Sequence, residues 1–524
     1  MTAPGPPREP AGRPSVQTAQ AEGRRSIKMV ATILMSGALA GKALGFVREV
    51  IMAQIIGVAL IADGFRTAVT AILLPLAFLQ NESVPAILIP MMKESQRHGD
   101  APQRLASLSA ALVFIGVLLM LLMLAAGKLL VDAMVAGFTP EGQKMTLHFV
   151  RIMALSMPAS VLINCLAAGE IALGKTRMTN LRASILNIGV IAGLGLLVVT
   201  RNPSVLAWAF TLAFNLLAAW GCWRLMREGN LSFAGLTART AAKEGLEFLR
   251  RVRPFLALPA AEQANIWLER LLASRLVTGA VASLDYARTL TDSTLLLISQ
   301  PIGLALLAEN RVLDDRQQAE AIARPVLAVA IPASVFLYMF ATDIVRLVFH
   351  RGAFGEHGVV LTSQALSGIA LGLWASTLGW ILLRLLNNRR RNAAAAFILI
   401  SAYAANFGMN LLTENLQRTS GMGVFFIGTG EAARSLVLLL GVVAALGCGA
   451  MLMRLIALCV PAAALMLLLG WQIGQALPPS FERLVLGGVT CGACALLSAR
   501  LLCPALLGAV FIRVRNLVFR RTPS

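Results

Sequence analysis

The chain has 524 residues, of which 57% are hydrophobic and 14% are charged, and its mean hydropathy is +0.74. A soluble domain carries about 25% charged residues, so this composition excludes a water-soluble globular protein. Apolar runs of about 20 residues, the length that crosses a bilayer as a helix, recur along the chain. The alternating pattern of a membrane β-barrel is absent from the sequence. We therefore predict an all-α polytopic membrane protein.

The first segment, residues 1–28, is rich in Pro and Ala and has no apolar core. We predict a disordered cytoplasmic tail there and not a signal sequence. About fourteen transmembrane spans are then predicted by their length and apolar character. Their ranges are 29–55, 62–90, 105–134, 146–171, 181–199, 204–226, 254–276, 281–307, 325–348, 360–386, 393–412, 422–446, 450–474 and 484–511.

An internal repeat organises these spans. The pattern R-x8-G-x5-D-x2-R-T begins at Arg48 and again at Arg270, and the matched residues are rare types in so apolar a chain. Six spans precede the second copy, so the repeat predicts two parallel six-helix lobes that superpose by rotation about an axis near the membrane normal. The predicted domains are an N-lobe (29–226), a cytoplasmic linker (227–253), a C-lobe (254–446), two further helices (447–511) and a basic C-terminal tail (512–524).

The net charge of +20 would suit a nucleic-acid partner. The basic residues, however, concentrate in alternate loops, as in Arg389–Arg391. That distribution follows the positive-inside rule, so it predicts topology and no nucleic-acid partner. Both termini are expected in the cytoplasm, and the loop "HRGAFGEHG" (350–358) is expected to face outwards.

Charged residues within the spans indicate a functional cleft. Each costs about 2.5–3.5 kcal/mol at the centre of a membrane helix and therefore needs a partner or a wet cavity. Arg pairs bidentately with phosphate oxygens, and Lys adds a point charge, so we predict a cationic cavity between the lobes that binds an anionic amphiphile. The candidate residues are Lys42, Arg48, Glu49, Asp63, Arg66, Arg270, Arg275 and Arg288.

Structural alternatives apply to several of these residues. Asp63 and Asp285 would equally serve as N-caps of the second and eighth helices, each pairing with the arginine three residues later. Arg48 would alternatively extend to the membrane surface. Glu431 and Arg434 have the spacing of a self-satisfied pair.

Oxygen-bearing residues on spans seven, eleven and twelve form a candidate coupling-ion site for Na⁺ or H⁺, with inter-helix hydrogen bonds as the alternative. They are Glu262, Asn265, Asn406, Asn410 and Thr429. Cys491 and Cys494 have the spacing of a redox motif, but they lie within a span and are read as helix packing. The sequence has no HExxH-type metal cluster, and neither a metal nor a cofactor is expected.

Four stretches resemble the MurJ/MviN family, the lipid II flippases of the multidrug/oligosaccharidyl-lipid/polysaccharide exporter superfamily. They are "GKALGFVREVIMAQIIGVALIADGF" (41–65), "VPAILIPMMKE" (84–94), "ASRLVTGAVASLDYARTL" (273–290) and "LVFHRGAF" (347–354). The resemblance implies two six-helix lobes that alternate between inward and outward openings, with a lipid-facing groove made by the last two spans.

The family's site residues carry over in part. Its first-span cation corresponds to Lys42, its "R-[DE]" to Arg48–Glu49 and its second-span aspartate to Asp63. The second-span arginine falls on Leu76 and the acidic residue of "AEG" on Asn81, while the eighth-span arginine is displaced to Arg288. These departures leave open whether the glycan is lipid II or another unit.

The sequence therefore predicts a non-enzymatic, monomeric flippase of the bacterial inner membrane. Its partners would be membrane lipids and an undecaprenyl-pyrophosphate-linked glycan, either lipid II or an exopolysaccharide or O-antigen unit. Two alternatives remain, a multidrug or cation antiporter of the same superfamily and a scaffold for envelope assembly. A glycosyltransferase or ligase is disfavoured because the short outer loops hold no paired carboxylates.

Overall fold

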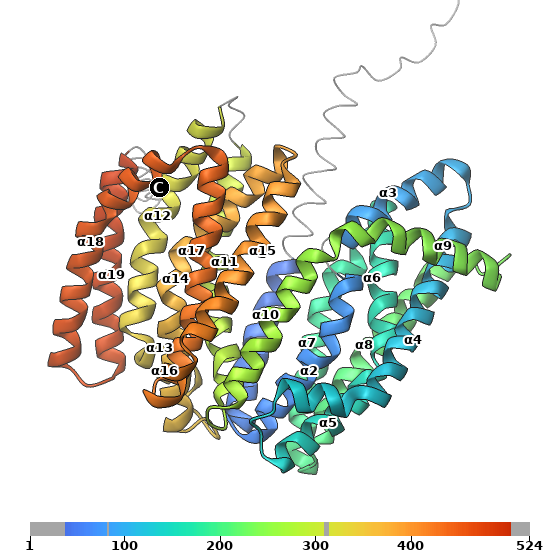
Figure 1. Ribbon diagram of the computed structural model, residues 1–524, viewed down its shortest axis with the longest axis horizontal. Helices are drawn as coiled ribbons and strands as arrows, with labels where there is room; N and C mark the ends of the chain where they lie inside the picture. The colour runs from blue at the N-terminus through green and yellow to red at the C-terminus, as the bar shows by residue number, and fades with distance from the viewer. Residues whose placement is uncertain (1–36, 81–82, 309–313, 505–524) are drawn as a thin grey trace, which may run out of the picture.

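The computed structural model describes residues 37–80, 83–308 and 314–504, and these residues form helices joined by turns, with no β-strand among them. Two helical lobes lie side by side, and α10 runs between them (Figure 1). The predicted tails, 1–28 and 512–524, lie outside the described residues.

The first lobe begins with a helix over 37–56. It continues with α2 (Leu60–Gln80), α3 (Ser83–His98), α4 (Ala101–Met134), α5 (Pro140–Ala154), α6 (Met157–Ala172), α7 (Arg177–Thr200) and α8 (Ser204–Arg227). The connection to the second lobe contains α9 (Ala238–Val252) and the short turn η1 (Arg253–Phe255).

The second lobe consists of α10 (Ala257–Ser274), α11 (Ala280–Ala308), α12 (Asp315–Met339), α13 (Ala341–Phe349), α14 (Glu356–Asn388), α15 (Asn392–Leu412), α16 (Glu414–Thr419) and α17 (Gly423–Leu446). The chain then forms α18 (Gly449–Ala476) and α19 (Phe481–Leu502), which stand beside α12 at the edge of the molecule (Figure 1). Gly447, with φ +67°, ends α17 in the left-handed conformation that favours glycine, so the predicted break there is confirmed.

Among the described residues, ten helices are long and apolar enough to cross a membrane, or eleven when α5 and α6 count as one bent span. The helix over 37–56, α10 and α11 are the other long helices at predicted spans, and each carries three charged residues. Together they are consistent with the fourteen predicted spans. The all-α polytopic fold is confirmed.

The span predicted at 62–90 holds α2 and α3, and residues 81–82 between them lie outside the described residues. Two other predicted spans are not continuous helices. The span predicted at 146–171 is two helices bent by 46°, with Pro158 in the first turn of the second, where it lacks the N–H that a continuous helix would use. The ninth span breaks at Phe340, between α12 and α13.

The inter-lobe linker contains a helix, α9, that was not predicted, because its low hydropathy does not indicate a membrane span. Thr237 and Thr240 form a reciprocal capping box at the start of α9. Gly245, Phe248 and Val252 then bury one face of this helix against the N-lobe. The cap and the i, i+3, i+7 spacing were visible in the sequence.

The first helix packs closely on α7 through its glycines. A Cβ atom on Gly41 would lie 2.7 Å from the Cβ of Ala183, and Gly37 faces Asn180 in the same way. This close approach requires glycine, since any side chain at these positions would force the two helices apart.

Candidate functional site

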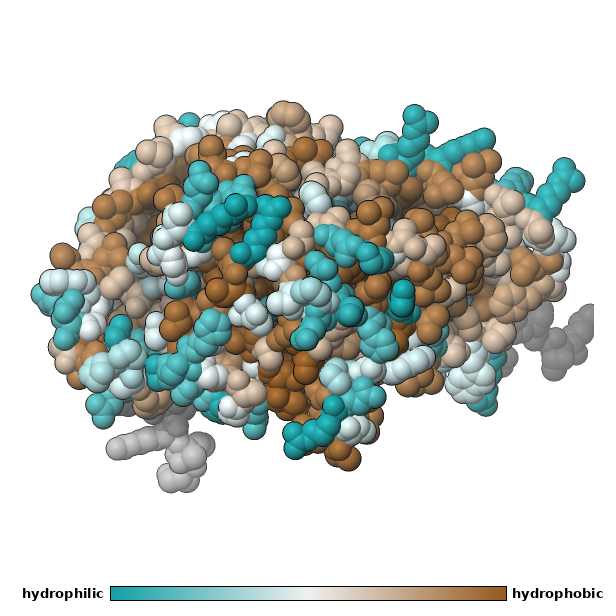
Figure 2. Space-filling model, turned by 60° about the horizontal axis from the view of Figure 1, so that its bottom comes forward, coloured by the Kyte–Doolittle hydropathy of each residue, from teal (hydrophilic) through white to brown (hydrophobic). Residues whose placement is uncertain are grey.

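The two lobes meet at the end of the bundle that holds the α13–α14 turn, which we call the outer end. Gly57 (φ +57°) and Gly279 (φ +95°) are the matched glycines of the repeat, and both adopt conformations that favour glycine. A Cβ on Gly57 would lie 2.4 Å from the carbonyl oxygen of Ala353. The Ala353 amide donates to the carbonyl of Gln54 across the lobes at 2.8 Å. Figure 2 brings this end forward and shows polar side chains spread among apolar ones.

Asp63 joins the lobes by capping a helix of the opposite lobe. Its carboxylate accepts hydrogen bonds from the backbone amides of Gly279 (2.6 Å) and Ala282 (2.8 Å), at the start of α11. The prediction that Asp63 caps its own helix is wrong, because α2 begins at Leu60 and Asp63 already lies in its first turn. A carboxylate at a helix N-terminus satisfies free N–H groups and is favoured by the helix dipole.

Arg66 is buried between charges of both lobes. It pairs with Glu49 of the first helix and lies 3.4 Å from the carboxylate of Asp285 on α11. Its guanidinium also stacks over the ring of Tyr286, 4.2 Å from the centroid. The predicted Asp63–Arg66 pair is not among the ion pairs of the described residues.

Asp285 has a different role from its repeat partner Asp63. Both of its oxygens accept from the same guanidinium nitrogen of Arg270, at 2.9 and 2.8 Å. It lies in the second turn of α11, so the prediction that it caps this helix is also wrong. Arg288 lies 3.7 Å from it, as the i, i+3 spacing predicted.

The two predicted cations of the first helix lie in different surroundings. Arg48 donates to Glu49 (3.1 Å) and to Asn187 of α7 (2.9 Å), so the alternative that it extends to the membrane surface is wrong. Lys42 is exposed and has no hydrogen bond or ion pair within the described parts of the chain. Neither cavity described below includes Lys42 in its lining.

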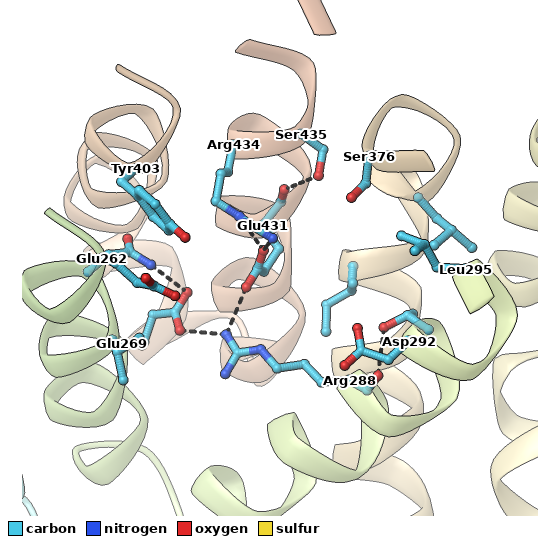
Figure 3. A pocket seen from close by; sticks show the side chains of 15 residues that line it. Glu262, Glu269, Arg288, Asp292, Leu295, Ser376, Tyr403, Glu431, Arg434 and Ser435 are labelled. Carbon is cyan, nitrogen blue, oxygen red and sulfur yellow. Dashed lines mark hydrogen bonds and ion pairs between the residues drawn. The ribbon is translucent and has the colours of Figure 1, made fainter. Parts of the chain in front are cut away.

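A cavity of about 280 Å³, the charged cavity, lies among α10, α11, α14, α15 and α17 (Figure 3). Arg288 reaches across it to Glu269 and, at 3.1 Å, to Glu431. The predicted Glu431–Arg434 pair is confirmed at 2.7 Å. Four carboxylates but only two guanidinium groups line this space, so the expectation of a cationic cavity does not describe it. The charged residues of the lining are Glu262, Glu269, Asp292, Glu431, Arg288 and Arg434.

A second space of about 550 Å³, the inner cavity, adjoins the charged cavity and shares Glu262, Asp292 and Tyr403 with it. It continues away from the outer end, towards Gln80 and Arg384. Asp292, Tyr403 and Arg384 were missed as site residues. The i, i+7 spacing of Asp285 and Asp292 on one helix face would have indicated Asp292.

Most of the candidate coupling-ion residues come together, but through hydrogen bonds with Glu269 and with each other. The amide of Asn406 donates to Glu269 (2.9 Å), that of Asn410 donates to Asn406 (2.7 Å), and that of Asn265 lies 3.4 Å from Glu269. Glu262 lines the charged cavity beside them.

Thr429, in contrast, donates to the carbonyl of Phe426 within its own helix and is not part of either cavity wall. In the described part of the chain, no three His, Cys, Asp or Glu side chains are arranged to hold a metal ion.

Two further predicted features, Arg275 and the cysteine pair, lie outside both cavities. Arg275 is exposed and pairs with Glu414 at 3.2 Å, so the structure does not bring it to the cavities. Cys491 and Cys494 are both unoxidised thiols, and Cys491 contacts the carbonyl of Pro332 at 3.6 Å. The helix-packing interpretation of this pair fits these contacts.

Two lobes of membrane helices around buried charges and a shared cavity define a multi-pass membrane transporter. A family model described as "Lipid II flippase MurJ" matches residues 52–474. The chain belongs to this family, whose members are multi-pass proteins of the bacterial inner membrane.

Individual relatives agree with this assignment. The chain is 27% identical over 367 residues to a "Probable lipid II flippase MurJ" of Rhizobium tropici, covering 66% of this chain and 68% of the relative. A protein of the same description from Bdellovibrio bacteriovorus is 26% identical over 447 residues, covering 80% and 82%.

Solved structures show the same fold. "Lipid II flippase MurJ, inward closed conformation" aligns with a TM-score of 0.76 at 16% identity, over 93% of this chain and 100% of that one. An inward-facing multidrug resistance MATE family transporter aligns with a TM-score of 0.57 at 14% identity, over 80% and 98%.

Proposed function

We propose that this protein is a flippase that moves an undecaprenyl-pyrophosphate-linked glycan, lipid II or a related envelope precursor, across the inner membrane by alternating access. The observation that carries the proposal is that two lobes hold each other at the outer end through hydrogen bonds and ion pairs, while the inner cavity, away from these contacts, is lined by Gln80 of the N-lobe and by helices of the C-lobe. Contacts of this kind can break and re-form as the cleft opens to either side. The proposal involves no catalytic step.

The headgroup would enter the cleft while the lipid tail stays in the bilayer. Lys42, which is exposed, and Arg48, whose side chain is 32% exposed, are the first-helix cations available to a pyrophosphate. Arg66 and Arg270 are more deeply buried in ion pairs and would hold the lobes together instead.

Large apolar side chains on the last two helices fit contact with lipid. Leu468, Trp471 and Val489 are each at least 60% exposed. We place these helices against the tail of the substrate, with both termini in the cytoplasm, the outer end facing outwards and the protein acting as a monomer.

We propose only the chemical class of the glycan, a unit linked to undecaprenyl pyrophosphate. Leu76, which stands where typical members carry arginine, is 1% exposed within the N-lobe core. The second departure, Asn81, lies outside the described residues. Loss of a site arginine at position 76 is compatible with a headgroup other than lipid II.

A second candidate function is export of cationic compounds, and the excess of carboxylates in the charged cavity favours it. In the flippase proposal these carboxylates, with Asn265, Asn406 and Asn410, instead bind a coupling Na⁺ or H⁺ during the cycle. Thr429 would join them only after a change of rotamer, since its hydroxyl is bonded within α17.

The test is expression of the gene in a bacterium depleted of its own lipid II flippase. Growth would establish lipid II transport. If growth fails, proteoliposomes that hold purified protein and either lipid II or a fluorescent cation would separate the candidates. Export of the cation without flipping of lipid-linked glycans would overturn the flippase proposal, and inactivity towards all of them would favour a scaffold.

A further inference from the structure

The arginines around the cleft divide into two groups. Arg48, Arg66, Arg270, Arg288 and Arg434 each have a carboxylate partner within 4 Å. Arg384 on α14 and Arg182 on α7 have no such partner among the described residues. An unpaired guanidinium beside a cavity is the arrangement that receives an anion.

Arg384 lines the inner cavity together with Trp380, one helical turn before it on the same face of α14. The lining also includes Gln80 at the end of α2, so both lobes contribute to this space. Pro259 and Leu399 supply apolar lining. The lining also holds the carboxylates of Glu262 and Asp292 and the paired Arg434, all shared with the charged cavity. Beyond this shared wall, the inner cavity combines a cation without a carboxylate partner among the described residues, an aromatic surface and hydrogen-bonding groups, a composition typical of sites for polar organic ligands.

Arg182 stands behind the Gln80 side of the inner cavity. Its guanidinium donates to the amide oxygen of Asn164 and lies 3.5 Å from that of Gln80. Gln80 in turn donates to the hydroxyl of Ser160 at 2.8 Å. Amide oxygens satisfy the N–H groups of Arg182 without neutralising its charge, so the N-lobe contributes a positive charge beside the Gln80 that lines the cavity.

We propose that the inner cavity is an oxyanion subsite for the headgroup of the substrate, in which Arg384 binds the anion directly and Arg182 supports it through Gln80. This inference rests on the proposed flippase function and adds a specificity-determining position to it. The oxyanion belongs either to the pyrophosphate or to a carboxylate carried by the glycan. Trp380 provides the surface against which the adjoining sugar packs.

Binding to full-length protein in nanodiscs tests the proposal with two probes, undecaprenyl pyrophosphate and lipid II, whose peptide carries carboxylates. Arg384→Gln removes the charge at an exposed position. The matched control is Arg390→Gln, an exposed arginine just beyond α14 that does not line the cavity. Loss of a charge-assisted hydrogen bond predicts affinity about tenfold to a hundredfold weaker for Arg384→Gln, with Arg384→Lys intermediate and Arg390→Gln unchanged.

The two probes identify the source of the anion. Weaker binding of both by Arg384→Gln assigns the subsite to the pyrophosphate, and weaker binding of lipid II alone assigns it to a carboxylate elsewhere on the headgroup. If the wild type binds the probes and Arg384→Gln binds them equally well, the subsite is wrong while the flippase proposal stands. Failure of the wild type to bind either probe overturns the flippase proposal itself.

Discussion

The two copies of the repeated motif contain the same residues and use them differently. In the N-lobe copy, Asp63 accepts two backbone amides at the start of α11 in the other lobe. In the C-lobe copy, Asp285 pairs with the side chains of Arg270 and Arg66. The repeat thus preserved a carboxylate at the same place in each lobe, while the neighbouring lobe determined whether that carboxylate binds backbone or side chain.

The arginines of the two copies are more alike. Arg66 pairs with Glu49 and Arg288 with Glu269, in each case a carboxylate on the helix that precedes. The acids themselves do not match in the repeat, since they lie 17 and 19 residues before their arginines. The pairing was therefore kept although the position of the acid changed.

Asp285→Asn is expected to have the largest effect on stability. The substitution leaves Arg270 without its carboxylate partner and removes one of the two carboxylates near Arg66. Breaking a buried ion pair in this way costs about 3–5 kcal/mol of folding free energy. Thermal unfolding in detergent should show a clear drop, with less folded protein recovered. A melting temperature equal to that of the wild type would contradict the description of Asp285 as a buried ion-pair partner.

Asp63→Ala removes the inter-lobe cap and is expected to cost about 0.5–2 kcal/mol. Asp63→Asn should cost less, because Asn keeps one of the two acceptor oxygens. The readout is labelling of a cysteine placed at Ala353 on a Cys-less background. Both variants should raise labelling at the outer end, in the order Ala above Asn. Unchanged labelling would show that the cap does not hold the lobes together.

Gly57→Ala and Gly279→Ala compare the matched glycines directly. Each forces a side chain into a left-handed conformation at about 1–2 kcal/mol, and each new Cβ meets a backbone carbonyl of the other lobe, that of Ala353 for Gly57 and that of Val58 for Gly279. Gly408→Ala is the control, because that Cβ meets no atom within 4 Å. Both variants should lower the melting temperature relative to this control, and equal values for all three would contradict the contact.

Lys42→Ala should have no effect on stability and is expected to abolish transport. Its repeat counterpart is Ala264, so this cation belongs to the N-lobe alone. Lys42 has no ion pair in the described structure, and its removal therefore strands no buried carboxylate. Flipping of lipid-linked substrate in proteoliposomes, at matched protein abundance, is the measurement. Normal flipping would remove Lys42 from the binding site.

The sequence by itself determined the class of fold, the approximate spans and the positions of the repeat. Hydropathy acts over about 20 consecutive residues, so it is readable without any knowledge of contacts. The same rule explains the omissions. Helix α9 is too polar to register as a span, and the break between α5 and α6 changes direction without changing hydropathy.

Only the tertiary structure decided which charges remain available to a ligand. The partners of Asp63 lie 216 and 219 residues away, and a sequence spacing cannot reveal a hydrogen bond across two lobes. The structure pairs most of the predicted cations with carboxylates and sends Arg275 to Glu414. Among the residues that the structure describes, Lys42 and Arg384 have no carboxylate partner, because the net charge of a cleft depends on which helices face each other and not on the charges that each helix carries.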